Sequence, residues 1–295
     1  MVHPTQMNFL LSTTCFSAFV ITVFAFAATG LEKIDCERLL RISLTTFSVF
    51  GAVIYIFFGW KLIPHDSSNV TVMAVSVPYL VPTNRRDWKR WLAIALILVA
   101  IVGSNTSSPM GVACVALTSY FILNGHSKRW MLLAPIPIVT GGLVYGWGKI
   151  LNDTDRFKAY RAFMGYWMSD DQAVGNILFG YGPGSFETIS QVIQQKMMFH
   201  LWYDAEGKLK GYLWMHMHSD LLQFIFEYGL IGASLLAVCA FTVWKGLAQF
   251  KNERVVFLGC LSAMIFDFPC RYPAVPIILL LLYGLSLQSP ADRKL

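Results

Sequence analysis

Long apolar runs occupy most of this 295-residue chain, and they limit its fold more than any other feature. A helix needs about 20 consecutive, mostly apolar residues to cross the hydrocarbon core of a bilayer. Hydrophobic residues make up 56% of the chain and charged residues only 14%, a composition that is unusual for a soluble globular domain. We therefore expect an all-α membrane protein in which lipid surrounds most of the structure.

Nine of the runs are candidate transmembrane helices, and we expect them to form a single polytopic domain over residues 1–295. The candidates are Asn8–Gly30, Ile42–Ile63, Val70–Thr83, Trp91–Ser104, Met110–Leu123, Trp130–Gly148, Leu221–Leu247, Val255–Asp267 and Ala274–Leu287. The third run contains Pro78 and Pro82, so a kinked or partly re-entrant element is the alternative to a full span there.

Lysine and arginine are distributed unevenly between the connections. If all nine runs cross, one alternating set of connections holds fourteen of these residues, and the other short connections hold only Lys61 and Arg271. Because cytoplasmic connections are rich in basic residues, this asymmetry predicts a multi-pass protein of the bacterial inner membrane with a cytoplasmic carboxyl terminus. The segment 149–217 is then a periplasmic loop. The basic residues form no continuous face, so the net charge of +6 does not indicate a nucleic-acid partner.

The periplasmic loop is expected to contain short amphipathic helices, the first of which starts at Asp153-Thr154-Asp155. One arginine and three aromatic residues follow at i, i+4, i+7 and i+11 and share a face of this helix: Arg156, Tyr160, Phe163 and Trp167. Such a face suits the membrane interface, where lipid-linked phosphates lie. A helix that is merely anchored at the interface is the alternative. Arg161 lies about 140° from Arg156 around the helix and points elsewhere.

A glycine-rich turn, Gly180–Phe186, comes next. Its alternating glycines and its proline exclude a helix before Ser185, and this serine can cap a helix over Phe186–Met198. Backbone N–H groups near a helix amino terminus can bind a phosphate oxygen. A plain turn without a ligand is the alternative, because the sequence has neither a P-loop lysine nor a dinucleotide-binding context.

Two histidines, His216 and His218, stand where the loop meets the run Leu221–Leu247. An unperturbed histidine titrates near neutral pH, so His218 can accept a proton from a sugar hydroxyl. We expect no metal site here, because no third ligand with suitable spacing is evident.

Three polar residues, Asp220, Gln223 and Glu227, follow on one face of the next helix. Glu227 lies about 10 Å along the helix from Asp220, which predicts a position inside the apolar layer. Ionisable side chains are costly there and are frequently functional. A structural ion pair or a hydrogen bond to another helix is the alternative for Glu227.

Taken in order, these motifs resemble the O-antigen ligase/polymerase family. The matching segments are Asp155-Arg156 with Tyr160, Gly180–Phe186, His218–Gln223, Glu227–Gly232 and Asp267–Ala274, and the resemblance covers about residues 85–288. It implies an inverting glycosyltransferase that needs no metal or cofactor. The donor is a glycan on undecaprenyl diphosphate, and the acceptor is lipid A-core or a growing polysaccharide on the periplasmic side.

The resemblance also implies roles for individual residues. Arg156 and His218 are the expected catalytic residues: Arg156 binds the diphosphate, for which a planar guanidinium is suited, and His218 activates the acceptor hydroxyl. The donor site is shaped by the Gly180–Ser185 turn. The expected substrate-binding residues are Arg161, Gly180, Gly182, Gly184, Ser185, His216, Asp220, Gln223 and Glu227. The chain departs from the family at Thr106–Gly111, where family members commonly have an arginine.

Two other classes of function are alternatives. A transporter or channel would use buried acids to line a pathway, but ionisable residues are almost absent from the other apolar runs. A non-catalytic partner in a polysaccharide-assembly complex would need the same membrane topology without activity. Transfer from a lipid-linked donor by the purified protein distinguishes an enzyme from both.

Overall fold

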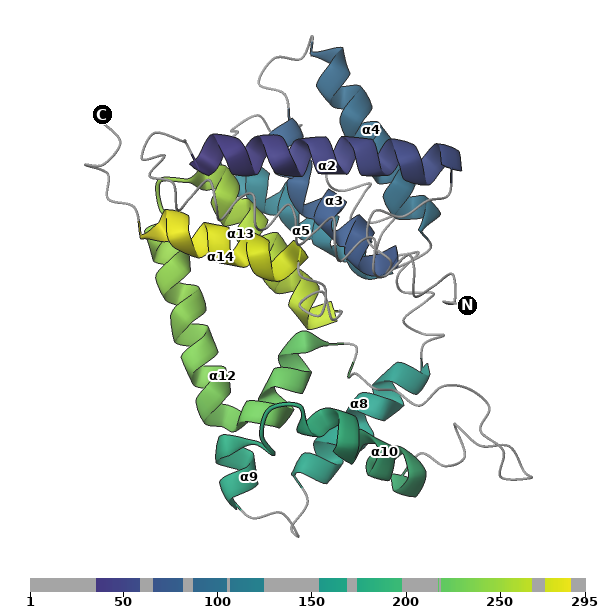
Figure 1. The fold of residues 1–295 in the computed structure, drawn as a ribbon, viewed down its shortest axis with the longest axis vertical. Coiled ribbons are helices and arrows are strands. Elements are labelled where there is room, and N and C mark those ends of the chain that lie inside the picture. The colour runs from purple at the N-terminus through teal and green to yellow at the C-terminus, as the bar shows by residue number, and fades with distance from the viewer. Residues whose placement is uncertain are drawn as a thin grey trace, which may run out of the picture. The chain divides into compact units, whose positions relative to one another are not determined.

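In the computed structural model, the described part of the chain is built from α-helices and contains no strand, which confirms the all-α class (Figure 1). The structure describes residues 36–58, 66–81, 87–104, 107–124, 154–168, 174–197, 217, 219–266 and 274–287. The helices are α2 (Cys36–Phe58), α3 (Asp66–Leu80), α4 (Trp88–Gly103), α5 (Ser107–Leu123), α8 (Thr154–Trp167), α9 (Val174–Phe179), α10 (Ser185–Met197), α12 (Asp220–Gly246), α13 (Lys251–Phe266) and α14 (Ala274–Ser286). The predicted spans Asn8–Gly30 and Trp130–Gly148 lie outside the described residues.

Two helices of the described part, α2 over Leu40–Phe57 and α12, are long and apolar enough to cross a membrane. Shorter apolar helices cover Val70–Leu80, Pro109–Leu123 and Val275–Ser286. Large apolar side chains are exposed on both long helices, including Phe57 at 71% and Leu235 at 62%. These features indicate association with a membrane.

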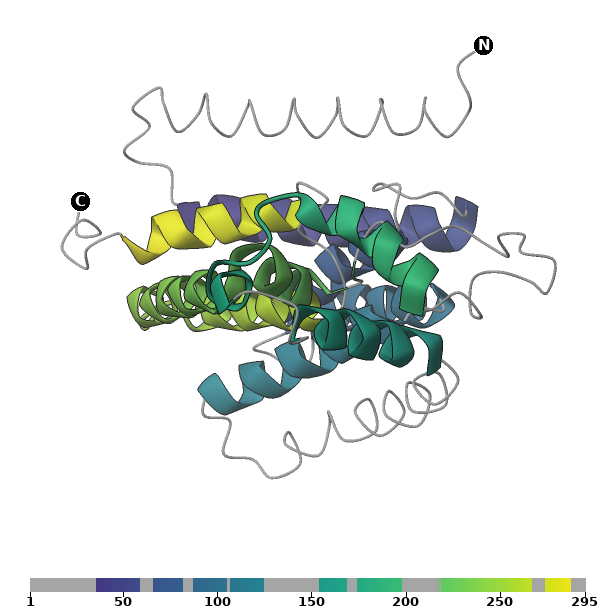
Figure 2. The same cartoon turned by 90° about the horizontal axis from the view of Figure 1, so that it is seen from below.

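The chain divides into two compact units. Unit 1 comprises Met1–Gly142, Val243–Ala263 and Pro269–Leu295, and unit 2 comprises Leu143–Thr242 and Met264–Phe268. In unit 1, α3 packs against α2, α4 and α5, while α14 runs beside α2 in both views (Figures 1 and 2).

Helix α3 forms the core of unit 1. Every residue from Val70 to Leu80 is buried, and Pro78 lies inside the last turn of the helix. The 15 residues of α3 extend about 22 Å, which is less than the thickness of a hydrocarbon core. The third predicted run is thus a helix enclosed by protein over Val70–Leu80, and its backbone is shielded by its neighbours.

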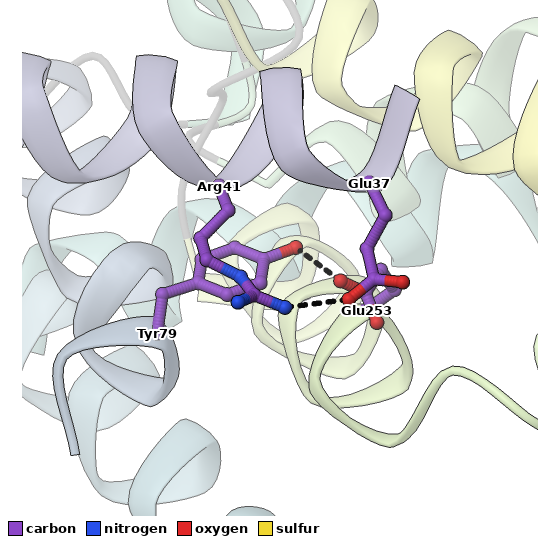
Figure 3. Close-up of polar contacts among 4 residues, drawn as sticks. All are labelled: Glu37, Arg41, Tyr79 and Glu253. Atoms are coloured by element: carbon purple, nitrogen blue, oxygen red, sulfur yellow. Dashed lines mark hydrogen bonds and ion pairs between the residues drawn. The ribbon is translucent and has the colours of Figure 1, made fainter. Parts of the chain in front are cut away.

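A polar cluster joins α2, α3 and α13 in unit 1 (Figure 3). The Tyr79 hydroxyl donates a hydrogen bond of 3.0 Å to Glu253 Oε1, and the Arg41 guanidinium pairs with Glu37 at 2.6 Å. The guanidinium carbon of Arg41 also lies 6.0 Å from the centre of the Tyr79 ring. Because Glu253 is only 2% exposed, its carboxylate depends on protein donors rather than on water.

Candidate functional site

The aromatic face of α8 lies in the hydrophobic core of unit 2. Phe163 and Trp167 are buried there, and Tyr160 packs against the same core. The rings of Phe163 and Phe186 lie 4.9 Å apart, which joins α8 to α10. The helix starts at Thr154 and its aromatic residues share a face, as predicted. Phe163 and Trp167 thus face the protein core and not the membrane interface, because periodicity identifies an apolar face without identifying what covers it.

The turn between α9 and α10 has left-handed backbone at three glycines: Gly180 at φ 75°, Gly182 at φ 95° and Gly184 at φ 75°. Residues with a Cβ rarely adopt such φ values, so the alternating glycines determine the path of the chain here. Helix α10 begins at Ser185, one residue before the predicted run Phe186–Met198. The Ser185 hydroxyl is buried and, within the described residues, makes no hydrogen bond, so the predicted side-chain cap is absent.

Helix α12 is broken at Gly229, where φ is 65° and ψ is −169°. The bend is visible in Figure 1. In a continuous helix, the carbonyls of Phe226 and Glu227 would accept hydrogen bonds from N–H groups four residues later. They accept instead from the glycine turn: Tyr181 N–H donates to Phe226 O at 3.2 Å, and Gly182 N–H donates to Glu227 O at 2.9 Å. The break therefore creates the acceptors that hold the turn.

The backbones of Gly180 and Gly229 come into direct contact. A Cβ at Gly180 would overlap the backbone of Glu227 and Tyr228, and a Cβ at Gly229 would overlap the backbone of Leu178 and Gly180. Two glycines 49 positions apart in the sequence thus permit this approach. The rise of about 10 Å from Asp220 to Glu227 lies within the first segment of α12, and the helix changes direction two residues later, at Gly229.

The side chain of Glu227 lies at the centre of the site. It is 8% exposed, and each of its carboxylate oxygens has a donor. Gly184 N–H donates to Oε2 at 3.1 Å, and the Gln223 amide nitrogen donates to Oε1 at 2.9 Å. On its other side, the Gln223 amide oxygen accepts from Met217 N–H at 3.4 Å. Three of the predicted residues, Gly184, Gln223 and Glu227, are thus in one hydrogen-bonded chain.

The start of α12 is held by Ser219, which is 1% exposed. Its hydroxyl oxygen accepts from Leu222 N–H at 3.3 Å, as an N-cap does, and the hydroxyl donates to Met264 O at 3.4 Å. Met217 is fully buried in the core of unit 2. The two neighbours of His218 in the chain, Met217 and Ser219, are therefore held in place by packing and hydrogen bonds.

From Gly180 to Ser185, every backbone N–H has an acceptor inside unit 2. Gly180 N–H donates to Asn176 O at 2.9 Å and Ser185 N–H to Gly182 O at 3.2 Å, while Pro183 has no N–H. The N–H groups of Tyr181, Gly182 and Gly184 are bonded to α12, as described above. The amides from Gly180 to Ser185 are therefore not free to bind a phosphate, and an anion beside the turn needs donors from the first turn of α10 or from side chains.

The side chain of Tyr181, a residue of the turn, packs against α12. Its ring stacks on Phe226 with 4.7 Å between centroids and lies 6.2 Å from the ring of Tyr166. Burial raises the pKa of the Tyr181 hydroxyl to about 12, with a further contribution from Tyr166, against a lowering by its hydrogen bond with Asn176. The phenol is thus neutral at physiological pH and serves as packing surface.

The remaining predicted residues are placed as follows. Arg156 belongs to α8, but its side chain lies outside the described residues, as do His216 and His218. Arg161 is exposed, and Asp220 begins α12. Within the described part of the chain, no group of three or more His, Cys, Asp or Glu could hold a metal ion.

Sequence reasoning missed four residues that build the site: Tyr181, Met217, Ser219 and Gly229. Gly229 stood in the recognised Glu227–Gly232 segment, but a glycine in an apolar run does not by itself indicate a break. Ser219, placed directly before the polar face of α12, is a typical N-cap and was recognisable as one.

Comparison with known protein families, with curated proteins and with solved structures finds no match to this chain. The function of this chain is therefore inferred from its motifs and from the geometry of unit 2.

Proposed function

We propose that this protein is a membrane glycosyltransferase of the O-antigen ligase/polymerase type. The acceptor hydroxyl attacks the anomeric carbon of the donor sugar, and the bond from that carbon to the phosphate oxygen breaks. The products are a new glycosidic bond and undecaprenyl diphosphate. The acceptor is lipid A-core or a growing glycan, and the reaction proceeds with inversion and needs neither metal nor cofactor.

One observation supports the proposal most directly. Two segments that resemble the family, Gly180–Phe186 and Glu227–Gly232, lie far apart in the sequence but are bonded together in unit 2 through Gly182, Gly184 and Glu227. A third such segment, His218–Gln223, is joined to them through Gln223.

In this proposal His218 removes the proton of the acceptor hydroxyl, and Arg156 stabilises the charge that develops on the departing diphosphate. Helix α8, which contains Arg156, packs on α10 immediately after the glycine turn. Because the amides from Gly180 to Ser185 are bonded within unit 2, side chains such as Arg156 are needed to neutralise the charge on the diphosphate.

The same proposal includes the membrane topology. The distribution of basic residues among the connections favours nine spans and a cytoplasmic carboxyl terminus. The loop 149–217 is then periplasmic. The span-length helices α2 and α12, with their exposed apolar side chains, support a lipid environment.

The proposal is tested with the purified protein and an undecaprenyl-diphosphate-linked O-antigen donor. We expect His218→Ala to lower the transfer rate by about 10²- to 10⁴-fold through loss of the general base. Arg156→Ala should lower it by about 10²- to 10³-fold. Gln191→Ala, at an exposed position on α10, is the control and should retain the wild-type rate. Full activity of both His218→Ala and Arg156→Ala would refute the mechanism.

The product distinguishes the two reactions of the family. In a strain that depends on this gene, loss of a polymerase leaves core plus one repeat unit, whereas loss of a ligase accumulates lipid-linked polymer. The lipopolysaccharide profile of the deletion strain reads out this difference directly.

A further inference from the structure

The polar side chains of Gln223 and Glu227 connect the glycine turn to the backbone beside His218. The path runs from Gly184 N–H to Glu227, from Glu227 to the Gln223 amide, and from that amide to Met217 N–H. We call these three hydrogen bonds, with lengths of 3.1, 2.9 and 3.4 Å, the Gln223–Glu227 relay. Its two ends are backbone groups separated by 33 positions in the sequence.

Donor and acceptor requirements define the direction of the relay. A carboxylate only accepts hydrogen bonds, so both Gly184 N–H and the Gln223 amide nitrogen must point at Glu227. The Gln223 amide oxygen is then left facing Met217 N–H, which is a donor. Each group meets a partner of the opposite kind, and both oxygens of Glu227 are used.

This arrangement leaves Glu227 little capacity to bind a substrate. It is buried at 8% exposure, and each of its two oxygens already accepts a hydrogen bond from the protein. The relay is also anchored at both ends, because Gly182 N–H is bonded to Glu227 O and Met217 is fully buried.

We propose that Gln223 and Glu227 are positioning residues that hold the backbone before His218 at a fixed place relative to the Gly180–Gly184 turn, and that neither contacts the substrate. This inference rests on the proposed function, since it assigns the purpose of the relay to the base His218. A base displaced by about 1 Å reacts far more slowly, so the relay is expected to act on the chemical step.

Exchanging the two side chains tests the relay. In the double variant Gln223→Glu/Glu227→Gln, a carboxylate at position 223 accepts from Met217 N–H and from the amide nitrogen at position 227. The amide oxygen at position 227 then accepts from Gly184 N–H, so all three hydrogen bonds are retained. In Glu227→Gln alone, one donor faces an NH₂ group, and in Gln223→Glu alone, two carboxylates face each other without a donor.

We expect each single variant to lower kcat by about tenfold or more, because a hydrogen bond to a charged group is lost, while KM changes by less than about threefold. The double variant should recover to within about threefold of wild type. If Glu227 instead binds or activates substrate through its charge, the double variant stays as impaired as Glu227→Gln, or the single variants raise KM at unchanged kcat. Either result would overturn the inference.

Hydrogen–deuterium exchange of the amides of Gly184 and Met217, measured without substrate, separates this inference from the proposed function. Faster exchange in the single variants with protection restored in the exchanged pair confirms the relay as a structural unit. Equal protection in all four proteins refutes it. A wild-type protein that is inactive on the lipid-linked donor refutes the proposed function and with it the link to His218, and the exchange pattern still decides whether the relay exists.

Discussion

At the scale of single residues, Gly229 has the most demanding environment in unit 2. Its φ of 65° with ψ of −169° belongs to a region that is essentially restricted to glycine, and a Cβ there would overlap the backbone of Leu178 and Gly180. We expect Gly229→Ala to destabilise the protein by more than about 2 kcal/mol, because strained backbone and a steric overlap combine. The midpoint of thermal unfolding in detergent measures this loss.

A matched control is available on α8. Gly165 is exposed inside that helix, and a Cβ there would meet nothing within 4 Å. Gly165→Ala should raise stability by about 0.5–1 kcal/mol, since alanine loses less conformational entropy in a helix. If the two substitutions have the same effect, the contact between Gly180 and Gly229 does not stabilise unit 2.

At the scale of helices, the Tyr79–Glu253 hydrogen bond links α3 to α13 within unit 1. Tyr79→Phe removes the hydroxyl that donates to Glu253, a residue that is only 2% exposed. Loss of this donor should lower the free energy of unfolding by about 1–3 kcal/mol. Tyr79→Phe/Glu253→Leu removes both partners and should recover part of this loss. Thermal unfolding of the four members of this double-mutant cycle gives the coupling.

Tyr283→Phe is the control for this pair, because Tyr283 is 49% exposed on α14. It should change stability by less than about 0.5 kcal/mol. A cycle with no coupling between positions 79 and 253 would contradict a stabilising role for the cluster in Figure 3.

Helix limits were largely predictable because they depend on local sequence. The expected run Phe186–Met198 is observed as Ser185–Met197, and Leu221–Leu247 as Asp220–Gly246. Glycines at the ends of helices and the periodicity of apolar residues predict such limits to within a few residues. The break at Gly229 was not predictable, because nothing in the local sequence distinguishes Gly229 from Gly232, which stays helical.

Contacts between distant segments could not be predicted from the sequence either, because they depend on tertiary packing. The spacing of Gln223 and Glu227 predicted that they share a helix face, and the structure confirms this through their hydrogen bond. That Gly184 completes the pair depends on tertiary packing 43 positions away. Likewise, the face of Phe163 and Trp167 was identified from periodicity, whereas its burial against Phe186 and Phe226 depends on the fold.

At the scale of the whole molecule, the exposed apolar side chains of α12 and the basic residues near its end both favour a helix that crosses the bilayer. Leu235, Val238 and Phe241 are more than half exposed, a costly arrangement in water over so long a helix. Lys245, Lys251 and Arg254 follow near its carboxyl end, where the positive-inside rule predicts cytoplasm. The two observations are independent, since one concerns packing and the other charge.

Cysteine labelling in intact cells tests this crossing, in a protein whose six native cysteines are replaced by alanine. We expect Thr188→Cys, exposed on α10, to react with a membrane-impermeant maleimide from outside, and Lys251→Cys, exposed at the start of α13, to react only after lysis. Leu235→Cys should stay unlabelled in both conditions although its side chain is 62% exposed, because lipid covers it. Labelling of positions 188 and 251 from the same side would mean that α12 does not cross. Ready labelling of position 235 from outside would place that face of α12 in water, and the periplasmic location proposed for the catalytic residues would lose its basis.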